Sequence, residues 1–234
     1  MAITVKPSAS SFPNWSVTML KPGVAVFDEN AEHYDQWFEQ HGPIYQAELS
    51  ALRRLMPDVE NAIEIGVGTG RFAAPLGVAV GVEPSAHMAQ IAEQRGITVT
   101  HAYGENLPFP DRTFDLALLV TVLCFVDDVS TVLREAGRIL KPEGYILIGM
   151  VDPTSPLGQS YETHKASSTF YREAHFHTVD EIVDLLQQSG FQDFEFCQTV
   201  FQSDLNPPEV LTVEDGHGKG AFVGMRARLA PESP

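Results

Sequence analysis

Cysteine, basic residues and long apolar runs are scarce in this chain of 234 residues. Its two cysteines, Cys124 and Cys197, both lie within apolar stretches, which indicates reduced core residues of a cytosolic protein rather than a disulfide. Only 15 Lys and Arg stand against 31 Asp and Glu, and the formal net charge is −16. This charge argues against a sequence-independent grip on nucleic-acid phosphates. No stretch approaches the roughly 20 consecutive apolar residues that a membrane helix needs.

The first 20 residues contain a single Lys and no apolar core of the kind found in secretory leaders, so we expect no signal peptide there. Residues 1–23 are rich in Ser and Pro and show no periodicity, which predicts a loose N-terminal arm. The hydrophobic content of 44% is ample for a core. We therefore expect one α/β domain over residues 24–234.

The most informative stretch is residues 62–71, which read A-I-E-I-G-V-G-T-G-R. A short apolar run leads directly into Gly66, Gly68 and Gly70, which predicts a buried parallel strand followed by a glycine turn. Glycine permits positive φ and a close approach of backbone N–H groups to a ligand. Because open α/β sheets bind ligands at the carboxyl ends of their strands, this turn predicts a nucleotide-like ligand.

A second apolar run over residues 78–82 ends at Glu83, whose carboxylate can accept hydrogen bonds from two ribose hydroxyls. A dinucleotide fingerprint would read G-x-G-x-x-G with its acid about 20 residues further on. Here the glycines read G-x-G-x-G and Glu83 follows 13 residues after Gly70, which favours S-adenosylmethionine over NAD. The sequence resembles the class I S-adenosylmethionine-dependent methyltransferases in four ordered motifs: residues 63–72, 81–85, 104–109 and 114–123.

The resemblance covers residues 27–229 and implies a Rossmann-like sheet of seven strands. These strands are mostly parallel with the last one antiparallel, and helices cover both faces. It also implies a set of cofactor-binding residues spread over the motifs: Tyr34, Glu64, Gly66, Val67, Gly68, Gly70, Glu83, Pro84, Ser85, Met88, Gly104, Glu105, Thr121 and Val122. Tyr34 belongs to an entry segment, residues 27–38, that folds over the cofactor in relatives. Packing of an N-terminal helix is the alternative role for that segment. Glu64 faces the methionine end of the cofactor in relatives.

Two positions depart from the family pattern. Tyr103 stands where relatives usually carry an acid that binds the adenine amine, so we expect backbone groups of Gly104 and Glu105 and a stacked aromatic ring to hold adenine instead. Cys124 stands where many relatives carry a histidine, and we interpret it as a core residue rather than a nucleophile.

Prolines and capping residues predict most of the helix boundaries. Pro43 and Pro57 bracket a helix, Ser85 caps another, and Thr178 opens a third through a capping box with Glu181. Residues 71–77 leave room for about two helical turns. We expect residues 153–174 to be irregular and residues 202–220 to form a long loop, within which Asn206-Pro207-Pro208-Glu209 is interpreted as a turn.

Fewer sequence features indicate which residues bind the methyl acceptor. We predict that residues 153–177 form a lid over the substrate, with His164, His175 and His177 as base candidates beside Tyr171 and Asp152. Surface loop histidines are the alternative interpretation. His175 and His177 would share one face of an extended segment, but no third ligand lies nearby in sequence, so we predict no metal site.

The leading hypothesis is therefore a cytoplasmic methyltransferase that uses S-adenosylmethionine, releases S-adenosylhomocysteine and acts on a small molecule. The most similar groups are quinone-biosynthesis-like enzymes and amine N-methyltransferases. A non-catalytic S-adenosylmethionine-binding module is the second hypothesis, kept open by Tyr103 and Cys124. An NAD-linked enzyme is the third. Glu83, as the ribose-binding acid, is expected at the protein surface when the cofactor is absent.

Overall fold

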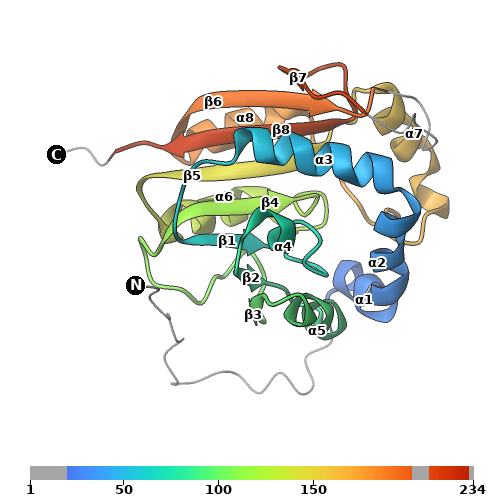
Figure 1. Cartoon of the computed structure of the whole chain (residues 1–234), viewed down its shortest axis with the longest axis horizontal. Coiled ribbons are helices and arrows are strands. Elements are labelled where there is room, and N and C mark those ends of the chain that lie inside the picture. Colours follow the sequence, from blue (N-terminus) through green and yellow to red (C-terminus); the bar gives the residue numbers. More distant parts are fainter. Residues whose placement is uncertain (1–19, 202–210, 232–234) are drawn as a thin grey trace.

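The computed structural model describes residues 20–201 and 211–231. Within these residues the strands form one mixed sheet (Figure 1), with the order β3 (Thr98–Thr100), β2 (Val80–Val82), β1 (Ala62–Ile65), β4 (Phe114–Val120), β5 (Leu140–Val151), β8 (Phe222–Leu229), β6 (Phe191–Thr199) and β7 (Glu214–Asp215). Strands β1 to β5 run parallel, whereas β8, β6 and β7 are antiparallel to their neighbours. This arrangement is the Rossmann-like fold that the motifs imply.

The helices of the described residues precede β1, connect the parallel strands or lie between β5 and β6. They are α1 (Pro22–Glu29), α2 (Ala31–Gln40), α3 (Gly42–Leu55), α4 (Ala73–Leu76), α5 (Ala86–Gln94), α6 (Val129–Ile139), α7 (Pro156–His164), the 3-10 turn η1 (Lys165–Ser167) and α8 (Val179–Gln188). Helices α6 and α8 cover one face of the sheet, and α3 crosses the other (Figure 1). Both faces of β4 are consequently buried, which explains its continuous apolar sequence.

The apolar stripe of α3 determines how this helix sits on the sheet. Ile44, Leu52 and Leu55 recur at helical spacing and are almost completely buried against the sheet. Glu48 occupies the same stripe and is only 9% exposed. Helix α3 therefore carries a carboxyl group into the interior, next to the first residues of the lid region.

Three predicted segments differ from the structure. The insertion expected to be irregular contains α7, because the Ser155 hydroxyl accepts a hydrogen bond from the Gly158 N–H at 3.0 Å and Pro156 begins the helix. The expected loop after the sixth strand contains β7, which pairs with β6 and makes eight strands instead of seven. Helix α1 begins at Pro22, inside the predicted arm. The predicted turn at residues 206–209 and the first 19 residues of the arm lie outside the described residues.

Candidate functional site

The glycine turn after β1 adopts the geometry that the sequence predicts. Gly66, Gly68 and Gly70 all have positive φ, between 54° and 80°. The Gly66 and Val67 N–H groups donate to the Val82 carbonyl, which ties the turn to the end of β2. A Cβ on Gly68 would lie 3.5 Å from the Met88 side chain and 3.9 Å from the Tyr34 ring. Gly68 therefore leaves its backbone accessible to a ligand beneath Tyr34.

Glu83 is held within this turn and is not a surface residue, which corrects the expectation from the sequence. It is 7% exposed, and its carboxylate accepts hydrogen bonds from the N–H groups of Gly68 and Ser85, both at 2.9 Å. Burial raises the pKa of Glu83 to about 7, against the opposing effect of these two donors. Asp28 of α1 lies above it and accepts a hydrogen bond from the Ser85 hydroxyl at 2.7 Å. The Asp28 carboxylate acts electrostatically on Glu83 and raises its pKa further, which the sequence pattern did not reveal.

A cavity opens beside Gly68 and Glu83, and we call it the glycine-loop cavity. Ten of the fourteen predicted cofactor residues line it: Tyr34, Gly66, Gly68, Glu83, Pro84, Met88, Gly104, Glu105, Thr121 and Val122. The other four are not among its lining residues. Val67 packs against Gly81, Gly70 against Ala92 and Ile97, and Ser85 caps α5.

Glu64 is almost fully buried, and one of its carboxyl oxygens has no hydrogen-bond partner among the described residues.

The donor set of the glycine-loop cavity fits S-adenosylmethionine. Each Glu83 oxygen receives one N–H and keeps a lone pair for a ribose hydroxyl. At another side of the cavity, the Lys21 ammonium pairs with Glu105 at 3.2 Å and Asp127 at 2.7 Å and lies 4.5 Å from the centre of the Tyr103 ring. Tyr103 lines the cavity, so it is available for the stacking role expected of an aromatic ring near adenine.

A second cavity of about 330 Å³ lies between α2, α3 and the α7 region, and we call it the aromatic cavity. Its volume is within the range of small-molecule sites. Ten aromatic side chains line it: Phe27, Tyr34, Trp37, Phe38, Phe72, Phe125, Tyr161, Phe170, Tyr171 and Phe222. Glu48 is its acidic residue, and His164 and Lys165 also reach it. The Lys165 ammonium pairs with Glu162 at 2.9 Å.

Four residues line both cavities: Phe27, Tyr34, Thr121 and Phe125. Thr121, at the carboxyl end of β4, has a φ of +49°, although β-branched residues rarely adopt this region. Its N–H donates to the Gly149 carbonyl at 2.7 Å. Strained residues of this kind concentrate at ligand-binding sites. These four residues therefore form a wall that the two cavities share.

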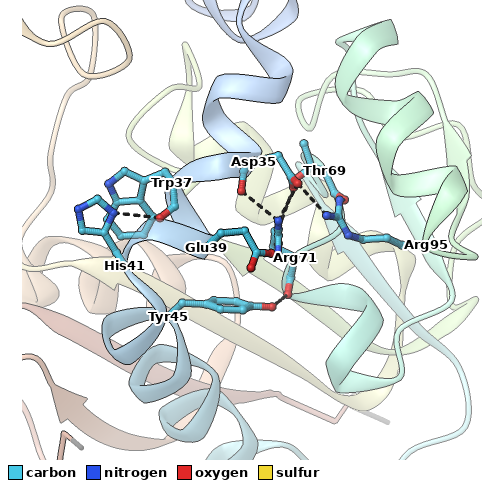
Figure 2. Close-up of polar contacts among 8 residues, drawn as sticks. All are labelled: Asp35, Trp37, Glu39, His41, Tyr45, Thr69, Arg71 and Arg95. Carbon is cyan, nitrogen blue, oxygen red and sulfur yellow. Dashed lines mark hydrogen bonds and ion pairs between the residues drawn. The ribbon is translucent and has the colours of Figure 1, made fainter. Parts of the chain in front are cut away.

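An ion-pair network holds α2, and with it Tyr34, against the glycine turn (Figure 2). Asp35 accepts two hydrogen bonds from the Arg71 guanidinium, at 2.7 and 2.8 Å, and one from Arg95 at 2.8 Å. Burial opposes ionisation of Asp35, but the hydrogen bonds from Arg71 and Arg95 outweigh it and hold its pKa at about 2. Arg71 follows Gly70 directly, so the network joins α2 to the glycine turn. Tyr45 adds a hydrogen bond to the Arg71 carbonyl at 2.5 Å.

The three histidines proposed as bases occupy different places. His164 is exposed at the end of α7, lines the aromatic cavity, and its Nδ1 lies 2.8 Å from the Ser160 carbonyl. His175 is exposed, and its ring contacts that of His177. Burial and the neighbouring His175 lower the pKa of His177, which lines a smaller cavity behind Tyr171. Of these three, His164 is the one that reaches the aromatic cavity.

The two cysteines and Asp152 contribute to packing and local hydrogen bonding. Burial raises the pKa of Cys124 to about 12, and its thiol donates to the Thr121 carbonyl at 3.4 Å, which agrees with a packing role. Cys197 is completely buried. Asp152 is buried and accepts hydrogen bonds from the Thr154 N–H and hydroxyl at the start of the α7 region.

In the described ranges, no group of three or more His, Cys, Asp and Glu is arranged to hold a metal ion. No described helix is both long and apolar enough to cross a membrane.

Sequence reasoning did not identify Glu48 as a site residue. The signal was present: Glu48 lies one turn after Ile44 and one turn before Leu52, inside an apolar helical stripe. An acid in such a stripe either finds a buried partner or faces a cavity. Phe170, Tyr161 and Tyr171, which belong to the predicted lid over residues 153–177, all line the aromatic cavity.

Comparison with known proteins gives one consistent result. A family described as "Methyltransferase domain" matches residues 63–148. An uncharacterised protein of Methanocaldococcus jannaschii is 44% identical over 202 residues, which cover 86% of this chain and 98% of that protein. A demethylmenaquinone methyltransferase of Tropheryma whipplei is 32% identical over 169 residues, covering 61% of this chain and 70% of the enzyme.

The fold comparison agrees with these relatives. The crystal structure of an S-adenosylmethionine-dependent methyltransferase from Thermotoga maritima, described as a "possible histamine N-methyltransferase", superposes with a TM-score of 0.85. The two chains are 44% identical, and the match covers 88% of this chain and 99% of that one. The glycine turn, Glu83 at the end of β2 and these relatives agree. The chain belongs to the S-adenosylmethionine-dependent methyltransferases.

Proposed function

We propose that this protein transfers a methyl group from S-adenosylmethionine to a small-molecule acceptor bound in the aromatic cavity. The observation that carries this proposal is the wall shared by the two cavities, formed by Phe27, Tyr34, Thr121 and Phe125. A cofactor held by the glycine turn and an acceptor held among the aromatic rings would meet at that wall. The volume of about 330 Å³ suits a small molecule better than a macromolecule.

The chemistry asks little of the protein beyond positioning. The sulfonium supplies an activated methyl group, and displacement requires the acceptor atom in line with the S–CH3 bond. Holding two reactants in that geometry accounts for a large part of catalysis in such reactions. Tyr34, fixed by the hydrogen bonds of Asp35 in α2, and Thr121, fixed at the end of β4, would set the approach. The aromatic side chains would exclude water from the reacting atoms.

The lid assignment belongs to this proposal. Residues 153–177, now seen to include α7 and η1, supply Leu157, Tyr161 and Phe170 to the aromatic cavity. The entry segment supplies Phe27 and Tyr34. We propose that these two segments together enclose the acceptor within one domain spanning residues 24–234, and that the reaction takes place in the cytoplasm. The small cavity and the net charge of −16 both disfavour a nucleic-acid acceptor.

Turnover separates this proposal from a non-catalytic cofactor-binding module. We expect S-adenosylhomocysteine to form from S-adenosylmethionine when the protein meets a suitable acceptor in a panel of small amines, phenols and quinols. Ser167 is exposed and lines only the aromatic cavity, so Ser167→Trp should block acceptor entry and reduce turnover while leaving cofactor binding intact. Ser50→Trp is the matched control, because Ser50 is exposed on α3 and lines neither cavity. Equal turnover by the two variants would refute the assignment of the aromatic cavity.

A further inference from the structure

Among the described residues, neither carboxyl oxygen of Glu48 has a partner, whereas the buried Glu64 lacks a partner at one oxygen. Glu83 receives two backbone N–H groups and Asp152 receives two donors from Thr154. Among the residues that the structure describes, none donates a hydrogen bond to the Glu48 carboxyl or forms an ion pair with it. Glu48 is nevertheless only 9% exposed and lines the aromatic cavity. A buried carboxyl without a partner is costly to fold, so its retention inside a cavity indicates that a ligand supplies the partner.

The remainder of the cavity specifies the charge of that ligand. Ring faces carry a negative electrostatic potential and attract cations, and aromatic cages are a recurrent way to bind ammonium groups. Phe27, Tyr34 and Phe170 pack against one another with ring centres 5.3 to 5.5 Å apart. Tyr161 and Tyr171 continue the ring cluster, 5.4 Å apart. Glu48 acts electrostatically on Tyr34, Tyr161 and Tyr171, so it lies within range of rings on several sides of the cavity.

Resting on the proposed function above, we propose that the acceptor is a small amine bound as its ammonium ion, with the Glu48 carboxylate as its charge partner. The cavity takes the organic part of the amine among the rings and the charged nitrogen at Glu48. This assigns a substrate class to the site and a substrate-binding role to Glu48.

The same group serves the methyl transfer. An ammonium nitrogen has no lone pair, so one N–H proton first moves to a Glu48 carboxylate oxygen, which leaves a neutral amine. The freed lone pair forms the bond to the methyl carbon while the C–S bond breaks and its electron pair goes to sulfur. The products are a methylated ammonium ion and neutral S-adenosylhomocysteine, and the proton on Glu48 returns to solvent when they leave.

Titration of the site follows from its surroundings. Burial alone raises the pKa of Glu48 to about 8, so the empty cavity holds a neutral carboxyl at neutral pH. The other titratable groups facing the cavity are Tyr34, Tyr161, Tyr171, His164 and Lys165. Burial raises the pKa values of the three tyrosines above their usual range, and Lys165 is paired with Glu162. A bound cation should therefore ionise Glu48 and expel its proton.

Calorimetric titration of the full chain with benzyltrimethylammonium tests this directly, because this cation can be neither deprotonated nor methylated. At about pH 6.5, in two buffers of different ionisation enthalpy, we expect close to one proton released per cation bound. Benzyl alcohol, the neutral probe, should release none. In Glu48→Gln the cation affinity should fall roughly 30-fold or more and proton release should vanish, whereas benzyl alcohol should bind as before. Unchanged cation affinity in Glu48→Gln, or no proton release by the parent, would overturn the proposal.

Two further measurements keep the test decisive. Phe170→Leu leaves the Glu48 carboxyl in place, so it should lower the affinity for benzyltrimethylammonium roughly fivefold while proton release is retained. An unchanged affinity would contradict the aromatic part of the site. Glu32→Gln is the matched control, since Glu32 is exposed on α2, and it should bind the cation like the parent. Titration with S-adenosylhomocysteine on the same samples separates the two proposals: a parent that binds it but shows no preference for the cation refutes the amine assignment alone.

Discussion

The unpartnered carboxyl of Glu48 predicts an unusual dependence of stability on pH. Its pKa is raised from 4.5 to about 8 in the folded protein. At roughly 1.4 kcal/mol for each tenfold change in proton affinity, this corresponds to about 5 kcal/mol between the two protonation states. The folded state holds the proton at pH values where the unfolded chain has lost it. The stability associated with this proton is therefore complete below about pH 4.5 and is lost as the pH rises through about 8.

Glu48→Gln replaces the titrating group by a neutral one of the same shape. We expect the variant to gain stability relative to the parent as the pH rises, by up to about 5 kcal/mol between pH 4.5 and pH 9. Urea unfolding at a series of pH values measures this difference through the midpoint and slope. Glu83, whose pKa is also raised by burial, titrates equally in both proteins and drops out of the comparison. Glu32→Gln serves as the exposed control, and parallel curves for Glu48→Gln and the parent would show that Glu48 ionises freely in the folded protein.

Three other substitutions test the cofactor side and the lid. Glu83→Ala should weaken S-adenosylhomocysteine binding, and it should lower the free energy of unfolding by about 1–3 kcal/mol because the Gly68 and Ser85 N–H groups lose their acceptor. Calorimetric titration and urea unfolding measure the two effects, and unchanged binding would contradict the assignment of Glu83 to the ribose. Asp35→Asn should cost roughly 1–3 kcal/mol at neutral pH, a difference that disappears between about pH 4 and pH 2 as the parent's Asp35 takes up a proton; a pH-independent cost in urea unfolding would contradict the charge argument. If His164 is the general base, His164→Gln should remove the fall in methyl-transfer rate at acid pH. If that fall is lost in Glu48→Gln and not in His164→Gln, Glu48 is the general base.

The sequence predicted the conformation of the glycine turn well, and the reason is local. A glycine turn requires positive φ at particular residues, and Gly66, Gly68 and Gly70 are the residues that adopt it. Parallel strands bring their carboxyl ends to one edge, so Gly68, Glu83 and Thr121 come together from three strands that lie side by side in the sheet. Short-range patterns and one topological rule were sufficient for this part.

The acceptor side depends on contacts between distant segments, which periodicity does not encode. Glu48 and Tyr161 border the same cavity although 113 positions separate their numbers in the sequence. The burial of Glu83 was likewise not predicted, because the sequence places it at the end of a strand and it is only 7% exposed in the structure. Helix α7 was missed because its signal is a single Ser-Pro pair that caps and begins the helix, with little apolar periodicity to follow. The errors on Glu48 and Glu83 concern where a segment packs, whereas the missed α7 is a helix whose local signal is weak.

The distribution of the two cavities along the chain limits what family membership says about the acceptor. The methyltransferase domain match spans residues 63–148, which contain β1 to most of β5 and 15 of the 20 residues that line the glycine-loop cavity. The aromatic cavity takes Glu48 from α3, Trp37 and Phe38 from α2, and Tyr161 from α7, all outside that match. The shared domain accordingly accounts for the S-adenosylmethionine site, while under the proposed function the segments that flank it would choose the acceptor. An unpartnered carboxyl among aromatic rings is the chemical feature of those segments, so substitutions at Glu48 should alter acceptor choice without altering the donor.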